Sequence, residues 1–293
     1  MATSAAVAAR RAPAARLGRV VDRWLLPIYV VGVTAYLILP VAIMILFSFN
    51  DPTGRSNLTW REFSFAAWLN PLGRPGLAEA VRNSLVVAVL ATLIATALGT
   101  MIGLALSRYA FRGRAATNVL IFLPMSTPEI VLGASLLTMF VASVQLPIPQ
   151  GVLFPLNIRT ILIAHIMFNI SYVVVTVKAR LANFPRHLEE AAMDLGANEW
   201  TTFWKVTFPL ILPGVIAAAL LAFSLSIDDY VVTAFTSGQT ETFPLYIYGS
   251  QLRGIPVQVN VIGTIIFVSA VLLVVMTTLW QRRVAARDYG AGV

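Results

Sequence analysis

Three acidic residues lie within long apolar runs of this 293-residue chain. Asp228 and Asp229 follow the stretch "LILPGVIAAALLAFSLSI", and Glu129 follows "NVLIFLPMSTP". A carboxylate in an apolar segment is costly unless it faces other protein or a water-filled cavity, and such acids often mark ion or substrate pathways. Carboxylates and aromatic faces such as Tyr230 can replace the water around an organic cation. Acids at these positions therefore indicate an acid-lined pathway within a membrane.

Structural roles compete with this interpretation. Asp228 and Asp229 could cap a break in a helix or pair with arginines of the outer loops, and adjacent helical residues diverge by about 100°, so we expect only one of them to face a pathway. Glu129 could stabilise a subunit contact. Tyr230 could anchor the chain at the membrane boundary, where aromatic residues are common.

Two prolines are expected to interrupt the helix before Glu129. Pro124 and Pro128 lack the N–H that a helix interior needs, and the carbonyls they free are tolerated in a membrane only against protein or a wet cavity. Glu129 would lie about 17 Å into its segment, and the aspartates about 22 Å from the inner surface, at a rise of about 1.5 Å per residue. The three acids fit a vestibule that opens outward.

The composition requires a membrane around these residues. Hydrophobic residues make up 58% of the chain, charged residues 12%, and the mean hydropathy is +0.80, which a soluble core of this size cannot bury. The predicted fold is an all-α membrane protein with six transmembrane helices, since about 20 helical residues cross the hydrocarbon core. The predicted spans are residues 24–49, 84–107, 118–141, 158–177, 212–236 and 259–280.

The basic residues set the expected orientation. Fifteen of the 21 Lys and Arg residues fall in the N-terminus, the second and fourth loops and the C-terminus. By the positive-inside rule both termini are cytoplasmic (N-in/C-in). We therefore divide the chain into a basic leader (1–23), a six-span transmembrane domain (24–281) and a tail (282–293). The first run is too long for a signal peptide and is interpreted as a retained span. The net charge of +8 is topological, so no nucleic-acid partner is expected.

Other polar residues receive structural interpretations. His165, Asn169 and Tyr172 fall on one face of the fourth span, where hydrogen bonding between helices is the usual role. Gly99 and Gly103 are spaced for close helix packing. The chain has no cysteine, and His187 has no neighbouring ligand, so we expect neither a disulfide nor a metal site.

The cytoplasmic loop at 182–211 contains two predicted helices. "EEAAMDL" has acids at its start and is followed by Gly196, which suits a short helix with a glycine stop. Asn198 is a good N-cap for a second helix, whose aromatic face would lie at the membrane interface. Pro209 and Pro213 are expected to break the entry into the fifth span.

The physical properties of this loop leave two roles open. A short helix that carries Glu189, Glu190 and Asp194 could enter a groove with a basic rim on another protein. An amphipathic loop that packs on lipid headgroups is the alternative.

"EAAMDLGANEWTTFWKVTFP" resembles the EAA loop of ABC importer permeases, which seats a coupling helix on the ATPase. The resemblance implies a type I importer permease fold. Val206 and Phe208 replace the Ile and Leu of the pattern. The residues that match the motif, and would couple to the ATPase, are Glu190, Ala191, Ala192, Gly196 and Pro209.

The resemblance extends from the first span to the last. "LPMSTPEIVLGASLL" and "LLAFSLSIDDYVVTAFTSG" are similar to the branch that imports spermidine and putrescine, in particular to its second permease subunit. In "GIPVQVNVIGT", Pro256 comes one place early and Gln258 stands where that branch has an acid. The resemblance implies that Asp228, Asp229, Tyr230 and Glu129 line the pathway of a small cationic substrate.

The implied protein is a non-catalytic subunit in a bacterial cytoplasmic (inner) membrane, surrounded by lipid. It has no G-x-x-x-x-G-K-[ST] stretch, so it would bind no cofactor itself, and ATP and Mg²⁺ would be bound by partner ATPase subunits. Further implied partners are a second permease subunit, in a heterodimer, and an extracytoplasmic solute-binding protein. A permease for another small solute and a self-sufficient secondary transporter are the alternatives.

Overall fold

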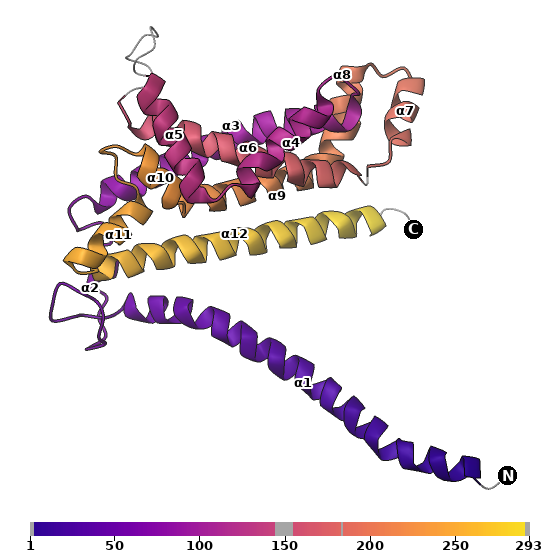
Figure 1. Cartoon of the computed structure of the whole chain (residues 1–293), viewed down its shortest axis with the longest axis horizontal. Coiled ribbons are helices and arrows are strands. Elements are labelled where there is room, and N and C mark those ends of the chain that lie inside the picture. The colour runs from indigo at the N-terminus through magenta and orange to yellow at the C-terminus, as the bar shows by residue number, and fades with distance from the viewer. Residues whose placement is uncertain (1–2, 144–154, 183, 291–293) are drawn as a thin grey trace. The chain divides into compact units, whose positions relative to one another are not determined.

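The structure is a computed structural model that describes residues 3–143, 155–182 and 184–290. Apart from one isolated antiparallel bridge between Asn50 and Phe63, its regular elements are helical (Figure 1). The helices are α1 (Thr3–Phe47), α2 (Ala66–Leu69), α3 (Leu77–Arg108), α4 (Arg114–Ser126), α5 (Glu129–Ser143), α6 (Ile158–Ala182), α7 (His187–Asp194), α8 (Glu199–Thr202), the π-helix η1 (Phe203–Thr207), α9 (Phe208–Ile227), α10 (Val231–Thr236), α11 (Phe243–Arg253) and α12 (Val257–Gly290).

Within these residues, five helices are long and apolar enough to cross a membrane. The pair α4 and α5 makes a sixth span if it is counted as one. The prediction of an all-helical, six-span chain is confirmed at this level. The chain divides into two compact units, Met1–Pro71 with Gly254–Met276 and Leu72–Arg253 with Thr277–Val293.

The first unit contains a loop between α1 and α2 that is ordered by two buried asparagines. Asn50 Nδ2 donates to Asn57 Oδ1 over 2.6 Å, and Asn57 Nδ2 donates to the Phe47 carbonyl over 2.7 Å at the end of α1. The backbone N–H of Asn57 also donates to the carbonyl of Ile255. Buried amides hold a loop only when their hydrogen bonds are made, so these bonds fix the loop between α1 and α2.

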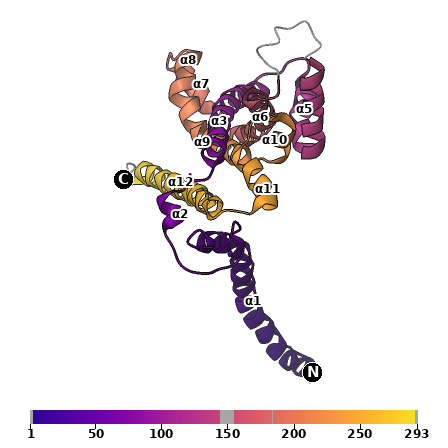
Figure 2. The ribbon, with the colours of Figure 1, turned by 90° about the vertical axis from the view of Figure 1, so that its left-hand side faces the viewer.

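The second unit is built on α3, α6 and α9, which pack along one another. A Cβ added to Gly99 would lie 2.6 Å from Val173 of α6, so only glycine permits this approach. The predicted role of the glycine pair in close packing is confirmed. In Figures 1 and 2, α7 and α8 lie at one end of this bundle and α5 at the opposite end.

The third predicted span is divided. α4 contains Pro124 and ends at Ser126; Thr127 is extended, as expected for a residue before proline, and α5 starts at Glu129 after Pro128. The two helices are bent by 109°. The predicted interruption before Glu129 is confirmed, and its direct cause is the proline pair.

The entry to the fifth span differs from the prediction. α8, η1 and α9 form one continuous helical segment over Glu199–Ile227, and Pro213 lies inside α9. The expected break at Pro209 and Pro213 is therefore wrong: a π-helical turn directly before Pro209 replaces it, because a wider turn leaves room for the proline ring.

The predicted span 212–236 is instead interrupted further along. α9 ends at Ile227, and α10 begins at Val231 after a short break that contains both aspartates. Aspartate side chains compete with the backbone for hydrogen bonds, which favours a helix end at this point. The fifth loop contains an additional helix, α11, which the sequence interpretation missed.

Candidate functional site

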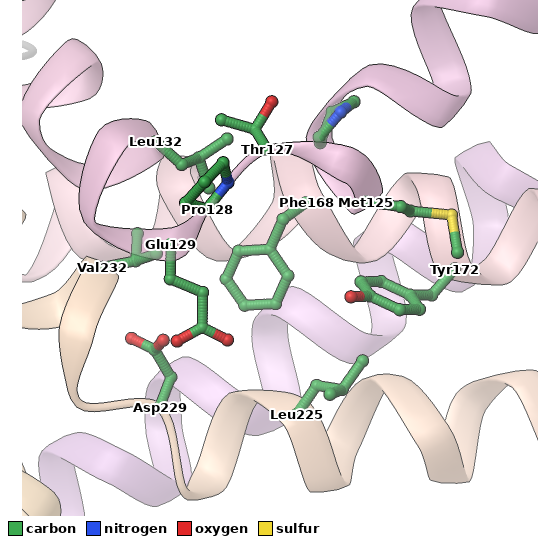
Figure 3. A pocket seen from close by; sticks show the side chains of 11 residues that line it. Met125, Thr127, Pro128, Glu129, Leu132, Phe168, Tyr172, Leu225, Asp229 and Val232 are labelled. Carbon is green, nitrogen blue, oxygen red and sulfur yellow. The ribbon is translucent and has the colours of Figure 1, made fainter.

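A cavity of about 230 Å³ lies where the bend between α4 and α5 faces the break between α9 and α10 (Figure 3). Glu129 starts α5, and Asp229 lies in the break, so both interruptions place an acid at this cavity. In Figure 3 the two carboxylates point toward one another. The lining residues are Pro124, Met125, Thr127, Pro128, Glu129, Leu132, Phe168, Tyr172, Leu225, Asp229 and Val232.

Asp229 is held by the helix that follows it. Its Oδ2 accepts the Thr233 N–H over 2.8 Å and the Thr233 hydroxyl over 2.6 Å, which caps the first turn of α10. His165 Nε2 of α6 lies 3.4 Å from the same oxygen, and the Asp229 side chain is 8% exposed. The capping role that the sequence left open for this pair of aspartates is thus seen at Asp229.

The hydrogen bonds around His165 form a directed chain. Thr233 gives its single hydroxyl proton to Asp229, so it must accept from His165 Nε2, 3.0 Å away. Asn169 Nδ2 donates to Ser226 Oγ over 2.8 Å, and Ser226 lies 3.1 Å from His165 Nδ1. His165 of α6 therefore contacts both sides of the break: Ser226 of α9, Asp229 in the break itself, and Thr233 of α10.

The predicted pathway residues are only partly brought together. Glu129 and Asp229 share the cavity, and Asp228 is exposed beside them and interacts electrostatically with both. Tyr230 does not line the cavity; its ring packs on Tyr248 of α11 with centroids 4.7 Å apart.

The arrangement favours a cationic ligand. Two carboxylates that face each other repel unless a positive charge lies between them. Phe168 and Tyr172 add aromatic surface to the same cavity, and an ammonium group binds to aromatic faces. The aromatic contribution of α6 was missed from the sequence, where Tyr172 was assigned a structural role and Phe168 was not singled out.

The loop between α6 and α9 has the predicted local structure. α7 ends at Asp194, and Gly196 has φ +89°, the left-handed conformation of a glycine stop. Asn198 caps α8 by accepting the Thr201 N–H over 2.8 Å. Glu190 and Ala191 are exposed on α7, Ala192 is half-buried, and Pro209 is exposed. Trp200 and Trp204 make an edge contact and are exposed.

Glu189 is placed differently from the other acids of α7. It forms a two-point ion pair with Arg108 at the end of α3, with Arg108 Nη2 2.6 Å from Glu189 Oε1. The Thr207 hydroxyl of η1 donates to the same oxygen over 2.5 Å. The prediction that Glu189 offers its charge to a partner's basic rim is therefore wrong. No local signal could identify this, because Arg108 is 81 residues away.

In the part of the chain that the structure describes, no three His, Asp or Glu side chains come together as a metal-binding set.

The sequence and fold place the chain in a known family. Residues 95–287 match the family described as "Binding-protein-dependent transport system inner membrane component". The chain is 37% identical over 252 residues to the spermidine/putrescine transport system permease protein PotC of Haemophilus influenzae, covering 86% of this chain and 94% of that protein. It is 35% identical over 249 residues to the putrescine transport system permease protein PotI of Escherichia coli, covering 83% and 85%.

Solved structures agree on the fold. A bacterial ABC transporter involved in the import of the acidic polysaccharide alginate matches with a TM-score of 0.68 at 18% identity, over 92% of this chain and 99% of that chain. An amino acid ABC transporter matches with a TM-score of 0.54 over 76% of this chain and all of that chain. The chain belongs to the binding-protein-dependent transport system inner membrane components, and is a multi-pass inner-membrane permease with an ABC importer fold.

Proposed function

We propose that this permease subunit imports polyamines of the spermidine and putrescine class, driven by ATP hydrolysis on separate subunits. The observation that carries the proposal is the cavity in which Glu129 and Asp229 face each other beside Phe168 and Tyr172. The relatives named above are polyamine permeases by name, which supports the same cargo.

The cavity has the chemistry that a polyamine needs. A linear amine with two or three positive charges must exchange water for carboxylates and aromatic faces as it enters the membrane. Glu129 is exposed and has room to meet an incoming ammonium group, whereas Asp229 is oriented from behind by Thr233 and His165. Asp228, exposed at the break, adds negative potential that attracts the cation.

The remaining parts of the transporter complete the proposal. ATPase subunits bind ATP and Mg²⁺ and seat on the loop between α6 and α9 and the start of α9, through Glu190, Ala191, Ala192, Gly196 and Pro209. A second permease chain forms the other half of the pathway, a binding protein delivers cargo from outside, and both termini are cytoplasmic. The chain itself catalyses no reaction. ATP-driven closure of the ATPases shifts the spans between two states that bind the cargo with different affinities.

The test is uptake of labelled spermidine and putrescine in cells that lack this gene. Wild type should restore energy-dependent uptake of both. Glu129→Gln should reduce uptake at least tenfold at low cargo concentration, with a larger effect on the more highly charged spermidine, because a partly desolvated charge pair is worth about 2–5 kcal/mol. Glu79→Gln makes the same chemical change at an exposed position outside the cavity and should match wild type.

Membrane levels of each variant must be compared by immunoblot. If wild type restores no polyamine uptake although the protein reaches the membrane, the proposed cargo is wrong. A competitor screen with other small cations then identifies the cargo, because the cavity would still require positive charge.

A further inference from the structure

One carboxylate joins three helical elements at the cytoplasmic-loop end of the second unit. Glu189 lies in the first turn of α7, Arg108 is the last residue of α3, and Thr207 ends the π-turn η1 that leads into α9. Glu189 contacts Arg108 through both oxygens, and its Oε1 also accepts from Thr207 over 2.5 Å. We call these three residues the Glu189 clamp.

We propose that Glu189 is a positioning residue that transmits the movement of α7 to α3 and α9. The inference rests on the proposed function for the idea that an ATPase pushes on α7, but the clamp itself is seen in the fold. Glu190 and Ala191 on the same helix are exposed and available to a partner, while Glu189 is turned toward the bundle. α7 therefore has an outer face that can receive force and an inner contact that can pass it on.

The clamp has the properties of a mechanical link. A guanidinium and a carboxylate that pair at two points hold distance and angle together, unlike a single hydrogen bond. The side chains of Arg108 and Glu189 are 17% and 16% exposed, so they are shielded from solvent. Water and salt screen a partly buried ion pair less than an exposed one, which makes separation of Arg108 and Glu189 unfavourable. We therefore expect α7 to move together with the end of α3.

Neighbouring contacts reinforce the link to α3. The Arg108 guanidinium lies 4.8 Å from the centroid of the Phe184 ring, and Arg186 Nη2 donates to the Ser107 carbonyl over 3.2 Å. Phe184 and Arg186 both lie in the segment between α6 and α7. The hydrogen bond from the Thr207 hydroxyl extends the link from Glu189 to η1, which leads into α9.

The first experiment measures coupling in proteoliposomes that contain the whole transporter. We expect Glu189→Gln and Arg108→Gln to raise the number of ATP molecules hydrolysed per spermidine transported at least tenfold, because α7 still receives the ATPase but no longer moves α3. The exchange Arg108→Glu with Glu189→Arg should restore at least a third of wild-type coupling. Arg114→Gln, an exposed arginine nearby, is the matched control.

A role in folding alone predicts a different result. The variants would then reduce the amount of assembled transporter while each assembled complex kept the wild-type ratio of ATP to cargo, and this would overturn the proposal. Thr207→Val keeps the ion pair and provides a milder variant; its ratio should rise about threefold.

A second readout does not depend on the cargo. The chain has no cysteine, so Arg112→Cys and Leu195→Cys can be spin-labelled specifically, near the end of α3 and just after α7. We expect one narrow distance distribution that stays narrow between nucleotide-free and ATP-bound transporter, and a distribution at least twice as broad in Glu189→Gln. An unchanged distribution in Glu189→Gln would refute the clamp even if the polyamine assignment holds. Failure of spermidine uptake with an intact clamp would refute only the cargo.

Discussion

Glu189 and Asp229 are carboxylates with similar tasks in different surroundings. Each joins helices that are distant in sequence: Glu189 joins α3, α7 and η1, and Asp229 joins α6 to the start of α10. Their partners differ. Glu189 pairs with a guanidinium that is always charged, so its charge is cancelled. Asp229 is held by the N–H and hydroxyl of Thr233 and lies beside the His165 ring.

The surroundings of these two carboxylates, rather than the acids themselves, distinguish their roles. Glu189 is paired with Arg108 and joins helices. Asp229 joins helices as well, but it also lines a cavity that contains a second carboxylate, Glu129.

Neutralising both cavity acids should separate cargo binding from ATP hydrolysis. Glu129→Gln with Asp229→Asn is expected to lower uptake about 100-fold or more at low cargo concentration, because two charge contacts of about 2 kcal/mol or more each are lost. ATP hydrolysis without cargo should persist. Uptake and hydrolysis are measured on the same proteoliposomes. Uptake within threefold of wild type would mean that Glu129 and Asp229 do not contact the cargo.

Removing the imidazole should destabilise the region around Asp229. His165→Ala removes one hydrogen-bond partner from each of Ser226 and Thr233 and opens a cavity, which should cost about 2–4 kcal/mol. Thermal unfolding in detergent should shift down by several degrees. His187→Ala, at an exposed position on α7, should leave the midpoint unchanged. Equal midpoints for the two variants would show that the chain of hydrogen bonds is not structural.

The two threonines provide a matched pair. Thr233→Val removes the hydroxyl between Asp229 and His165, and should cost about 2 kcal/mol because two buried partners are affected. Thr207→Val removes one bond to Glu189, which retains Arg108, and should cost about 1 kcal/mol. Thermal unfolding in detergent measures the loss of stability in both threonine variants. A larger loss of stability in Thr207→Val than in Thr233→Val would contradict the view that Arg108 still holds Glu189 when the Thr207 hydroxyl is removed.

The smallest effect is expected at Gly196, just after the end of α7. Gly196 has φ +89° with open space around it, so Gly196→Ala should cost about 1 kcal/mol through backbone strain alone. Gly32→Ala also enters open space, but inside α1 at ordinary φ, and should be neutral or slightly stabilising. Similar unfolding midpoints for the two variants would show that the left-handed stop contributes nothing to the position of α7.

Local features could be predicted from the sequence. The bend before Glu129 follows from Pro124 and Pro128, and the short helix of the cytoplasmic loop follows from its acids and Gly196. These effects act within one or two helical turns, so residue types at fixed spacing are sufficient. The sequence interpretation missed α11, and it expected a break where the structure has a π-turn followed by Pro209.

By itself, the sequence determined that the chain crosses a membrane several times, that three acids lie in its apolar runs, and that a capped helix precedes the fifth span, because hydropathy and capping are properties of neighbouring residues. The tertiary structure alone decided which side chains surround each acid. Glu189 and Arg108 are 81 residues apart, and His165 and Thr233 are 68 apart, so only the packing of α3, α6 and α9 sets which acid meets a guanidinium and which meets an imidazole. Electrostatic partners act over a few ångströms in space, whatever their separation along the chain.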